Sequence, residues 1–144
     1  DTGFRTLKLA HSNIRPWVAN TSDVAASLLG QLDHVDPGRN SDDVLHELLL
    51  KLGLDLCVSV LVRTIAGKTV QAVGGGVLTV CLDKVINVDE AEPLALGIVA
   101  WRKELAPAGD VTCVFLDSAF ENDVAKTNLA AILEQHGISK VRSL

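Results

Sequence analysis

The sequence contains no methionine and no tyrosine, and aromatic residues make up only 3% of its 144 positions. No uninterrupted apolar run approaches the roughly 18 residues of a membrane-spanning helix, so no membrane partner is expected. An apolar fraction of 48% excludes disorder, and 11 glycines with 4 prolines exclude a collagen-like chain. Because methionine is missing even at position 1, we expect a processed product or a piece of a longer protein. The length predicts a single domain over residues 1–144.

Basic residues are also few, with 13 against 18 acidic residues and a formal net charge of −5. Affinity for nucleic acid depends largely on cationic side chains that displace counterions, so this acidic domain is a poor independent DNA clamp. The first 18 residues are an exception, since Arg5, Lys8 and Arg15 outnumber the acids there. A solvated strand edge is the favoured interpretation. Weak phosphate contacts are the alternative, joined by Lys140 and Arg142 if the terminal strands are neighbours.

Cysteine is scarce. Cys57, Cys81 and Cys113 lie more than twenty positions apart, their number is odd, and each stands in an apolar run. This pattern predicts reduced thiols in the core of a cytosolic protein, and we therefore expect a cytoplasmic location.

The N-terminal part, residues 1–42, has little regular periodicity. Residues 4–9 alternate in the manner of an exposed strand. A short apolar piece at 24–32 predicts a helix, which ends at the Asp-Pro-Gly turn of 36–38.

The α/β core is expected at 43–144 and begins with an amphipathic helix. Asp42 or Asp43 is the predicted N-cap, and Gly53 is the expected stop. The predicted buried stripe consists of Val44, Leu45, Leu48, Leu49 and Leu52. The predicted outer face carries Asp43, His46, Glu47 and Lys51.

Residues 57–82 change to an alternating period. Runs rich in β-branched residues at 58–63, 69–73 and 77–82 are separated by an Ala66-Gly67 turn and by three glycines at 74–76. Tight glycine turns between such runs predict a three-stranded antiparallel meander.

The last third of the chain alternates helix and strand. Glu92-Pro93 is expected to open a helix, because proline is tolerated in a first turn, and Ala106-Pro107 is expected to close it. The continuous apolar run at 111–116 is typical of a strand buried on both faces.

A second helix is expected between an Asn122 cap and Gly137, followed by a short strand at 138–144. Since a strand–helix–strand unit crosses over right-handed, the last two strands are expected to be parallel. The sequence therefore predicts an α/β (mixed α+β) fold, in which flanking helices cover a mixed sheet made of the meander and a C-terminal βαβ unit.

Two glycine motifs resemble nucleotide-binding loops, but each lacks a residue or a structural context that such a loop requires. Gly67-Lys68-Thr69 lacks the first glycine of a phosphate-binding loop, because Val62 stands at that position, and its context is a hairpin. The glycines at 74–76 precede a strand where a dinucleotide fingerprint requires a helix.

Other catalytic signatures are incomplete as well. His46-Glu47 begins like a zinc-protease helix, but Leu50 occupies the place of the second histidine. The four histidines, at 11, 34, 46 and 136, are interpreted as surface or helix-end residues. Ser118 lacks the flanking glycines of a hydrolase elbow. No catalytic, cofactor-binding or metal-binding residue is predicted.

The densest group of polar residues, 117–128, follows the predicted buried strand, where open α/β sheets usually place ligands. The favoured interpretation is structural: Asn122 caps the helix, Asp123 pairs with Lys126, and Phe120 folds over the core. The alternative is an interaction or binding site made of Asp117, Phe120, Asn122, Asp123, Lys126 and Asn128.

An ordered set of phrases resembles the C-terminal region of the modification subunit of bacterial type III restriction–modification systems. The phrases run in the family's order over nearly the whole chain, and the clearest are Val80-Cys81-Leu82-Asp83 and LDSAFENDVAKTN at 116–128. Further matches are Gly3-Phe4-Arg5 with Leu7-Lys8-Leu9, Ser12-Asn13-Ile14 with Trp17, Leu48-Leu49-Leu50-Lys51 with Gly53-Leu54, and Gly67-Lys68-Thr69-Val70 with Gly74-Gly75-Gly76.

The resemblance implies a parent enzyme that methylates N6 of adenine in DNA with S-adenosylmethionine. The family's methyl-transfer motif contains two consecutive prolines, which are absent here, and its cofactor motif is also missing. No catalytic residue is carried over to any position, and no cofactor is expected to bind this fragment. A flipped base also needs an aromatic pocket, for which the chain has few residues.

The same resemblance implies an assembly module that contacts a second modification subunit or the restriction (translocase and nuclease) subunit, with DNA reached through the parent protein. Self-association through an apolar sheet face or helix is a subsidiary hypothesis. The alternatives are an auxiliary module that contacts the DNA backbone and an independent small-molecule-binding α/β domain with its site at 117–126.

Overall fold

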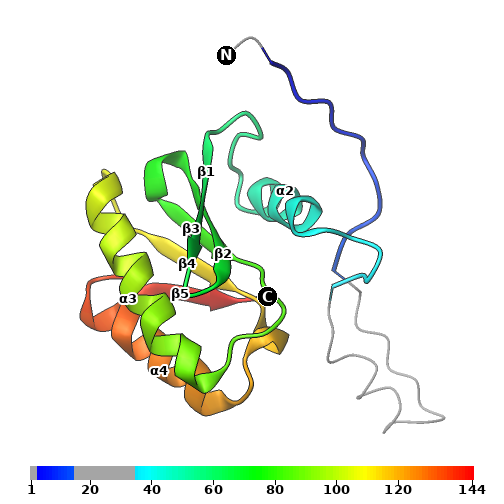
Figure 1. The fold of residues 1–144 in the computed structure, drawn as a ribbon. Helices are drawn as coiled ribbons and strands as arrows, with labels where there is room; N and C mark the ends of the chain where they lie inside the picture. The colour runs from blue at the N-terminus through cyan, green and yellow to red at the C-terminus, as the bar shows by residue number, and fades with distance from the viewer. Residues whose placement is uncertain (1–2, 15–34) are drawn as a thin grey trace, which may run out of the picture.

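A mixed sheet forms the centre of the part that the computed structural model describes, residues 3–14 and 35–144 (Figure 1). The five strands follow sequence order across the sheet: β1 (Val60–Ile65), β2 (Lys68–Val73), β3 (Leu78–Cys81), β4 (Thr112–Phe115) and β5 (Lys140–Ser143). β1, β2 and β3 are antiparallel, and β3, β4 and β5 are parallel. The predicted fold class is therefore confirmed, including the meander and the C-terminal βαβ unit.

Helices cover both faces of this sheet (Figure 1). α3 (Val88–Leu105) connects β3 to β4, and α4 (Asp123–Gln135) connects β4 to β5; these two pack side by side. α2 (Ser41–Lys51) lies on the other face. Successive strand residues point to opposite faces, so Lys68 of β2 pairs with Glu90 of α3 whereas Gln71 reaches Asp42 of α2.

The core lies in both interfaces between sheet and helix. All four residues of β3 are buried, as are three of the four in β4, which confirms the strand predicted from the apolar run at 111–116. α2 buries the predicted stripe of Val44, Leu45, Leu48 and Leu49. Each such aliphatic side chain contributes about 1.5–3 kcal/mol when it leaves water. Leu52 was expected on this stripe but is 37% exposed, because it lies at the C-cap, beyond the last helical residue.

The start of α2 differs from the prediction. Asn40 is the N-cap, in place of Asp42 or Asp43, and its side chain accepts the Asp43 N–H at 2.8 Å. Asp43 in turn accepts the Asn40 N–H at 3.2 Å, which completes a capping box. Reciprocal capping places the helix start earlier than an isolated aspartate would. Gly53 ends this region with a φ of 69°, as expected of the glycine after a helix.

α3 also begins earlier than expected. Asn87 is the N-cap and forms a capping box with Glu90, so the helix starts at Val88 and Glu92-Pro93 does not open it. Pro93 lies inside it, in the second turn. The predicted end is confirmed, because Ala106 adopts a left-handed φ of 45° immediately before Pro107.

Two helix contacts depend on close approach to the sheet. A Cβ added to Gly97 of α3 would lie 2.2 Å from Cγ2 of Ile65 in β1. The helix can therefore reach this end of β1 only because residue 97 has no side chain. On the same side, the Arg63 guanidinium lies 5.0 Å from the Trp101 ring centroid and pairs with Glu104 at 2.7 Å.

The predicted N-terminal strand is wrong. Residues 3–14 form no strand, and the regular pairing found for them within the described ranges is one isolated bridge between Ile14 and Val35. An alternating sequence becomes a strand only where a neighbouring strand accepts its backbone hydrogen bonds. The predicted helix at 24–32, Arg15 and His34 lie outside the described residues. The expected division into 1–42 and 43–144 stays a prediction.

Candidate functional site

The polar stretch 117–128 has one of the structural roles that the sequence favoured, the capping of a helix. It continues from β4 through a short 3-10 turn, Asp117–Ala119, to the start of α4. Asn122 is the N-cap of α4, and its Oδ1 accepts the Ala125 N–H at 2.9 Å. The predicted cap is confirmed.

The expected ion pair between Asp123 and Lys126 is not formed. Lys126 Nζ lies 2.5 Å from Oδ1 of Asp117 instead, and Asp123 occupies the first position of α4. The 3-10 turn that begins at Asp117 leaves this carboxylate within reach of the Lys126 ammonium. Both side chains of the pair are about half exposed, so it adds little to stability.

Phe120 packs against the core, as predicted. Its ring centroid lies 5.9 Å from that of Phe115 in β4, and its backbone forms a parallel bridge with Ile86. Phe120 and Lys126 also line a hollow of about 120 Å³ between α4 and β5. Asn128 is exposed on α4 and does not line that hollow. The six candidate residues therefore do not converge on one pocket.

The N-terminal arm, which we define as residues 3–11, runs away from the sheet and is exposed throughout (Figure 1). Its large apolar side chains are largely in water, with Phe4 88% and Leu9 94% exposed. Arg5 and Lys8 share this exposure. A chain that leaves so much apolar surface in solvent on one segment has a surface that another molecule can bury.

The expected grouping of basic residues from both ends of the chain is not found. Lys140 and Arg142 lie on β5, which pairs with β4, and the arm contributes no strand to the sheet. Lys140 also pairs with Asp110 at 3.0 Å. Within the described residues, the candidate phosphate contacts are thus Arg5 and Lys8 on the arm alone.

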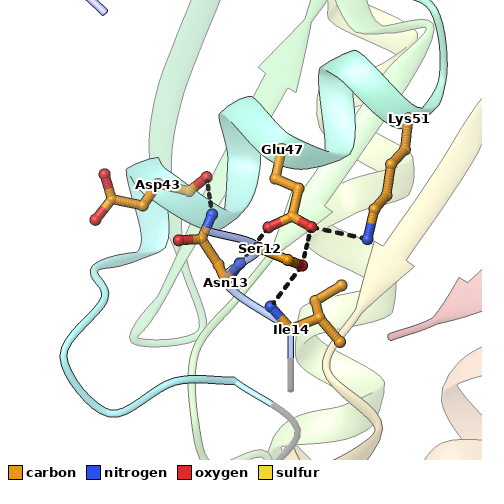
Figure 2. A network of polar contacts seen from close by, with 6 residues as sticks. All are labelled: Ser12, Asn13, Ile14, Asp43, Glu47 and Lys51. Carbon is orange, nitrogen blue, oxygen red and sulfur yellow. Dashed lines mark hydrogen bonds and ion pairs between the residues drawn. The ribbon is translucent and has the colours of Figure 1, made fainter. Parts of the chain in front are cut away.

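A polar network ties the end of the arm to α2 (Figure 2). Glu47 accepts the Ser12 hydroxyl and the Asn13 N–H, each at 2.5 Å. Lys51 reaches the same carboxylate at 2.8 Å, and the Asn13 side chain donates to the Asp43 carbonyl at 2.9 Å.

Charge and hydrogen bonding both favour the ionised form of Glu47. Burial raises the pKa of this carboxyl, but the hydrogen bonds from Lys51, Ser12 and Asn13 together with the Lys51 charge lower its pKa to about 2. The sequence placed Glu47 on an outer helix face and gave only one sign of a partner, the i,i+4 spacing to Lys51. The contact with Ser12 and Asn13 was missed, because it joins segments more than thirty positions apart.

A second exposed apolar surface lies at the edge strand β1. Its described hydrogen-bonding partner is β2, on one side only. Leu61 is 48% and Val62 62% exposed, and they point to opposite faces of the sheet. An edge strand with apolar side chains and unpaired backbone groups is a template for pairing with another chain.

A cavity of about 470 Å³ lies at the carboxyl ends of the parallel strands β3 and β4. Its walls come from the start of α2 and from the segments that follow these two strands. The lining residues are Val35, Arg39, Asn40, Ser41, Val44, Leu82, Asp83, Lys84, Leu116 and Ser118. The alternative small-molecule site that the sequence placed at 117–126 stays a prediction, and of those residues only Ser118 lines the cavity.

The cysteines are all free, and the expectation of three core thiols is only partly correct. Burial raises the pKa of Cys81 to about 11 and that of Cys113 to about 12. Cys57 is exposed, and it lies in the segment between α2 and β1. The described residues contain no group of three His, Cys, Asp or Glu side chains that could hold a metal ion.

Comparisons with known proteins add no relative to this description. No family model matches the chain, and neither a curated protein nor a solved structure matches it. None of the helices in the described ranges is long and apolar enough to cross a membrane.

Proposed function

We propose that this chain is a non-catalytic assembly domain from the C-terminal end of a type III restriction–modification methyltransferase subunit. The parent enzyme would methylate adenine N6 in DNA with S-adenosylmethionine bound elsewhere in the protein. The ordered phrases that end in LDSAFENDVAKTN support the family, and the surface of the folded chain supports the role.

One observation carries the assembly role: the arm holds Phe4 and Leu9 in water while Glu47 fixes its base to α2. Burial of exposed apolar side chains by a partner stabilises the complex by about 25 cal/mol for each Å² of apolar surface. A fixed base lowers the entropy cost of that binding, because fewer backbone angles remain to be ordered. The proposed partner is a second modification subunit or the restriction subunit.

The proposal places the parent's cofactor outside this chain, and the geometry of one glycine-rich turn supports that placement. Gly74–Gly76, the glycine-rich segment that comes nearest to a nucleotide-binding turn, is a 3-10 turn between antiparallel strands. Dinucleotide-type cradles instead use the N-terminus of a helix that directly follows a strand. In the proposal, the methyl-transfer chemistry therefore belongs to other parts of the parent enzyme.

Binding to the two candidate subunits tests the assembly role directly. Leu9→Asp on the arm should abolish binding to the purified restriction or modification subunit, while leaving the free energy of unfolding within about 0.5 kcal/mol of the original. Thr6→Asp is the matched control, since it adds the same charge to the arm without removing an apolar side chain. Binding would be followed by sedimentation velocity.

Two results would contradict the proposal. One is a chain that binds neither subunit and stays a 15.3 kDa monomer at high concentration. The other is S-adenosylmethionine binding at micromolar affinity by calorimetry, or methylation of duplex DNA by the chain alone. Either result would favour a catalytic domain or an independent binding module over an assembly domain.

A further inference from the structure

We propose that the 470 Å³ cavity beside the start of α2 binds a small organic phosphate monoester with a flat apolar body. This site is separate from the proposed assembly surface, and neither proposal depends on the other. It rests on the position of the cavity, on the chemistry of its floor and on the charges at its rim.

The position is one that open α/β sheets use for ligands. β3 and β4 are adjacent parallel strands, and the segments that leave their carboxyl ends, at Leu82–Lys84 in one case and at Leu116 and Ser118 in the other, form two walls of the cavity. In open α/β sheets, ligands bind outside the carboxyl ends of the strands. A volume of 470 Å³ falls within the range of small-molecule sites, about 300–1,000 Å³.

The floor is apolar and firmly packed. Val44 of α2, Leu82 and Leu116 all line the cavity, and their exposed fractions are 3%, 8% and 6%. Each belongs to the main hydrophobic core, so the floor is fixed by packing on its far side. A flat apolar group placed on it would leave water without displacing any core side chain.

The rim is cationic. Arg39 and Lys84 both line the cavity, and neither forms an ion pair with a described residue. The third charged residue, Asp83, turns one carboxylate oxygen to the Thr69 N–H at 2.6 Å, and so to the hairpin end of β2. The rim thus carries one net positive charge, and Ser41 and Ser118 also line the cavity.

These features select the ligand class. Arginine binds a phosphate with two parallel N–H donors, and lysine adds a point charge. Serine hydroxyls donate to the remaining phosphate oxygens. A bare phosphate would leave the apolar floor uncovered, whereas a neutral ring would leave both cations without a partner. A monoester with an apolar body uses both halves of the site.

Phenyl phosphate is a suitable probe, with inorganic phosphate and phenol as its two halves. Titrations of the whole chain, followed by amide chemical shifts, should show phenyl phosphate binding at least tenfold more tightly than either half. The shifted amides should include Ser41, Lys84 and Ser118. Arg39→Gln and Lys84→Gln should each weaken binding about tenfold, the effect of losing one charge-assisted contact.

Lys103→Gln is the matched control, because Lys103 is exposed on α3, which covers the opposite face of the sheet, and it should leave binding unchanged. Three outcomes would overturn the proposal: no saturable binding of phenyl phosphate, equal affinity for inorganic phosphate, or the same affinity in the Arg39→Gln and Lys84→Gln variants as in the original chain. None of these measurements involves the arm, so their results neither support nor contradict the assembly proposal.

Discussion

The Glu47 carboxylate accepts the backbone N–H of Asn13 at 2.5 Å and thereby joins two segments 34 positions apart in the sequence (Figure 2). This contact sets where the N-terminal arm leaves the body. Ser12 and Lys51 bind the same carboxylate, so the contact is part of a charge-assisted network.

Replacing Glu47 with Gln should loosen the base of the arm. The variant keeps one acceptor oxygen but loses the charge, so we expect a cost of about 1–2 kcal/mol and faster hydrogen exchange at the Asn13 amide. Glu92→Gln is the matched control, since Glu92 is exposed on α3. Equal exchange at Asn13 in all three proteins would show that the network does not hold the arm.

The lowered pKa of the Glu47 carboxyl predicts how the free energy of unfolding depends on pH. The pKa of Glu47 falls from 4.5 to about 2 in the folded chain, so its contribution to stability is present above pH 4.5 and is lost as the pH falls toward 2. The difference in unfolding free energy between the original chain and Glu47→Gln should therefore shrink across this window. Denaturant melts at stepped pH values measure it, and a constant difference would contradict the assigned pKa.

At the start of α4, Asn122→Ala should cost about 1 kcal/mol, because the Ala125 N–H loses its acceptor. Asp123→Ala should cost less, about 0.3–1 kcal/mol, since Asp123 acts only through the helix dipole. Thermal melts with Asn128→Ala as control measure both. If Asn122→Ala left melting unchanged but removed binding to a subunit, the stretch 117–128 would be an interaction site instead.

Gly97→Ala should destabilise the fold by about 1–2 kcal/mol, although alanine is the better helix former by about 1 kcal/mol. The new Cβ would overlap Cγ2 of Ile65, which the core holds in place. Gly109→Ala is the control, because a Cβ there meets nothing within 4 Å. In an Ile65→Ala background, Gly97→Ala should cost much less; an unchanged cost would refute the close approach.

The thiols should react in two classes. In the folded chain one thiol, that of Cys57, should react promptly with an aromatic disulfide reagent, while Cys81 and Cys113 react only after unfolding. Burial and their raised pKa values, about 11 and 12, keep the latter two protonated and out of reach. Cys57→Ser should remove the prompt reaction. A second fast thiol in that variant would contradict the placement of the core cysteines.

Local patterns predicted most of the core. The glycine turns at 66–67 and 74–76 defined the meander, and the run at 111–116 identified the central strand, because these features depend on neighbouring residues alone. The helix starts were less accurate. Asn40 and Asn87 act with Asp43 and Glu90 in reciprocal caps, and a single-residue capping rule selected later positions.

For the candidate sites, local sequence patterns predicted little, and tertiary structure decided most of the contacts. Lys126 has two aspartates within reach by sequence, and only the path of the 3-10 turn selects Asp117 over Asp123. Residues 4–9 alternate as a strand would, yet no described strand accepts them. The cavity combines Arg39, Val44, Lys84 and Ser118, which lie up to 79 positions apart along the chain. No local pattern could bring these residues together.

The sequence by itself determined the fold class and the order of helices and strands, because apolar periodicity and glycine turns act over a few residues. Tertiary structure alone decided that Glu47 holds the base of the arm and that two cations meet over the apolar floor between α2 and the strand ends. Both arrangements join segments far apart in the sequence, and only the packing of the folded chain brings such segments together.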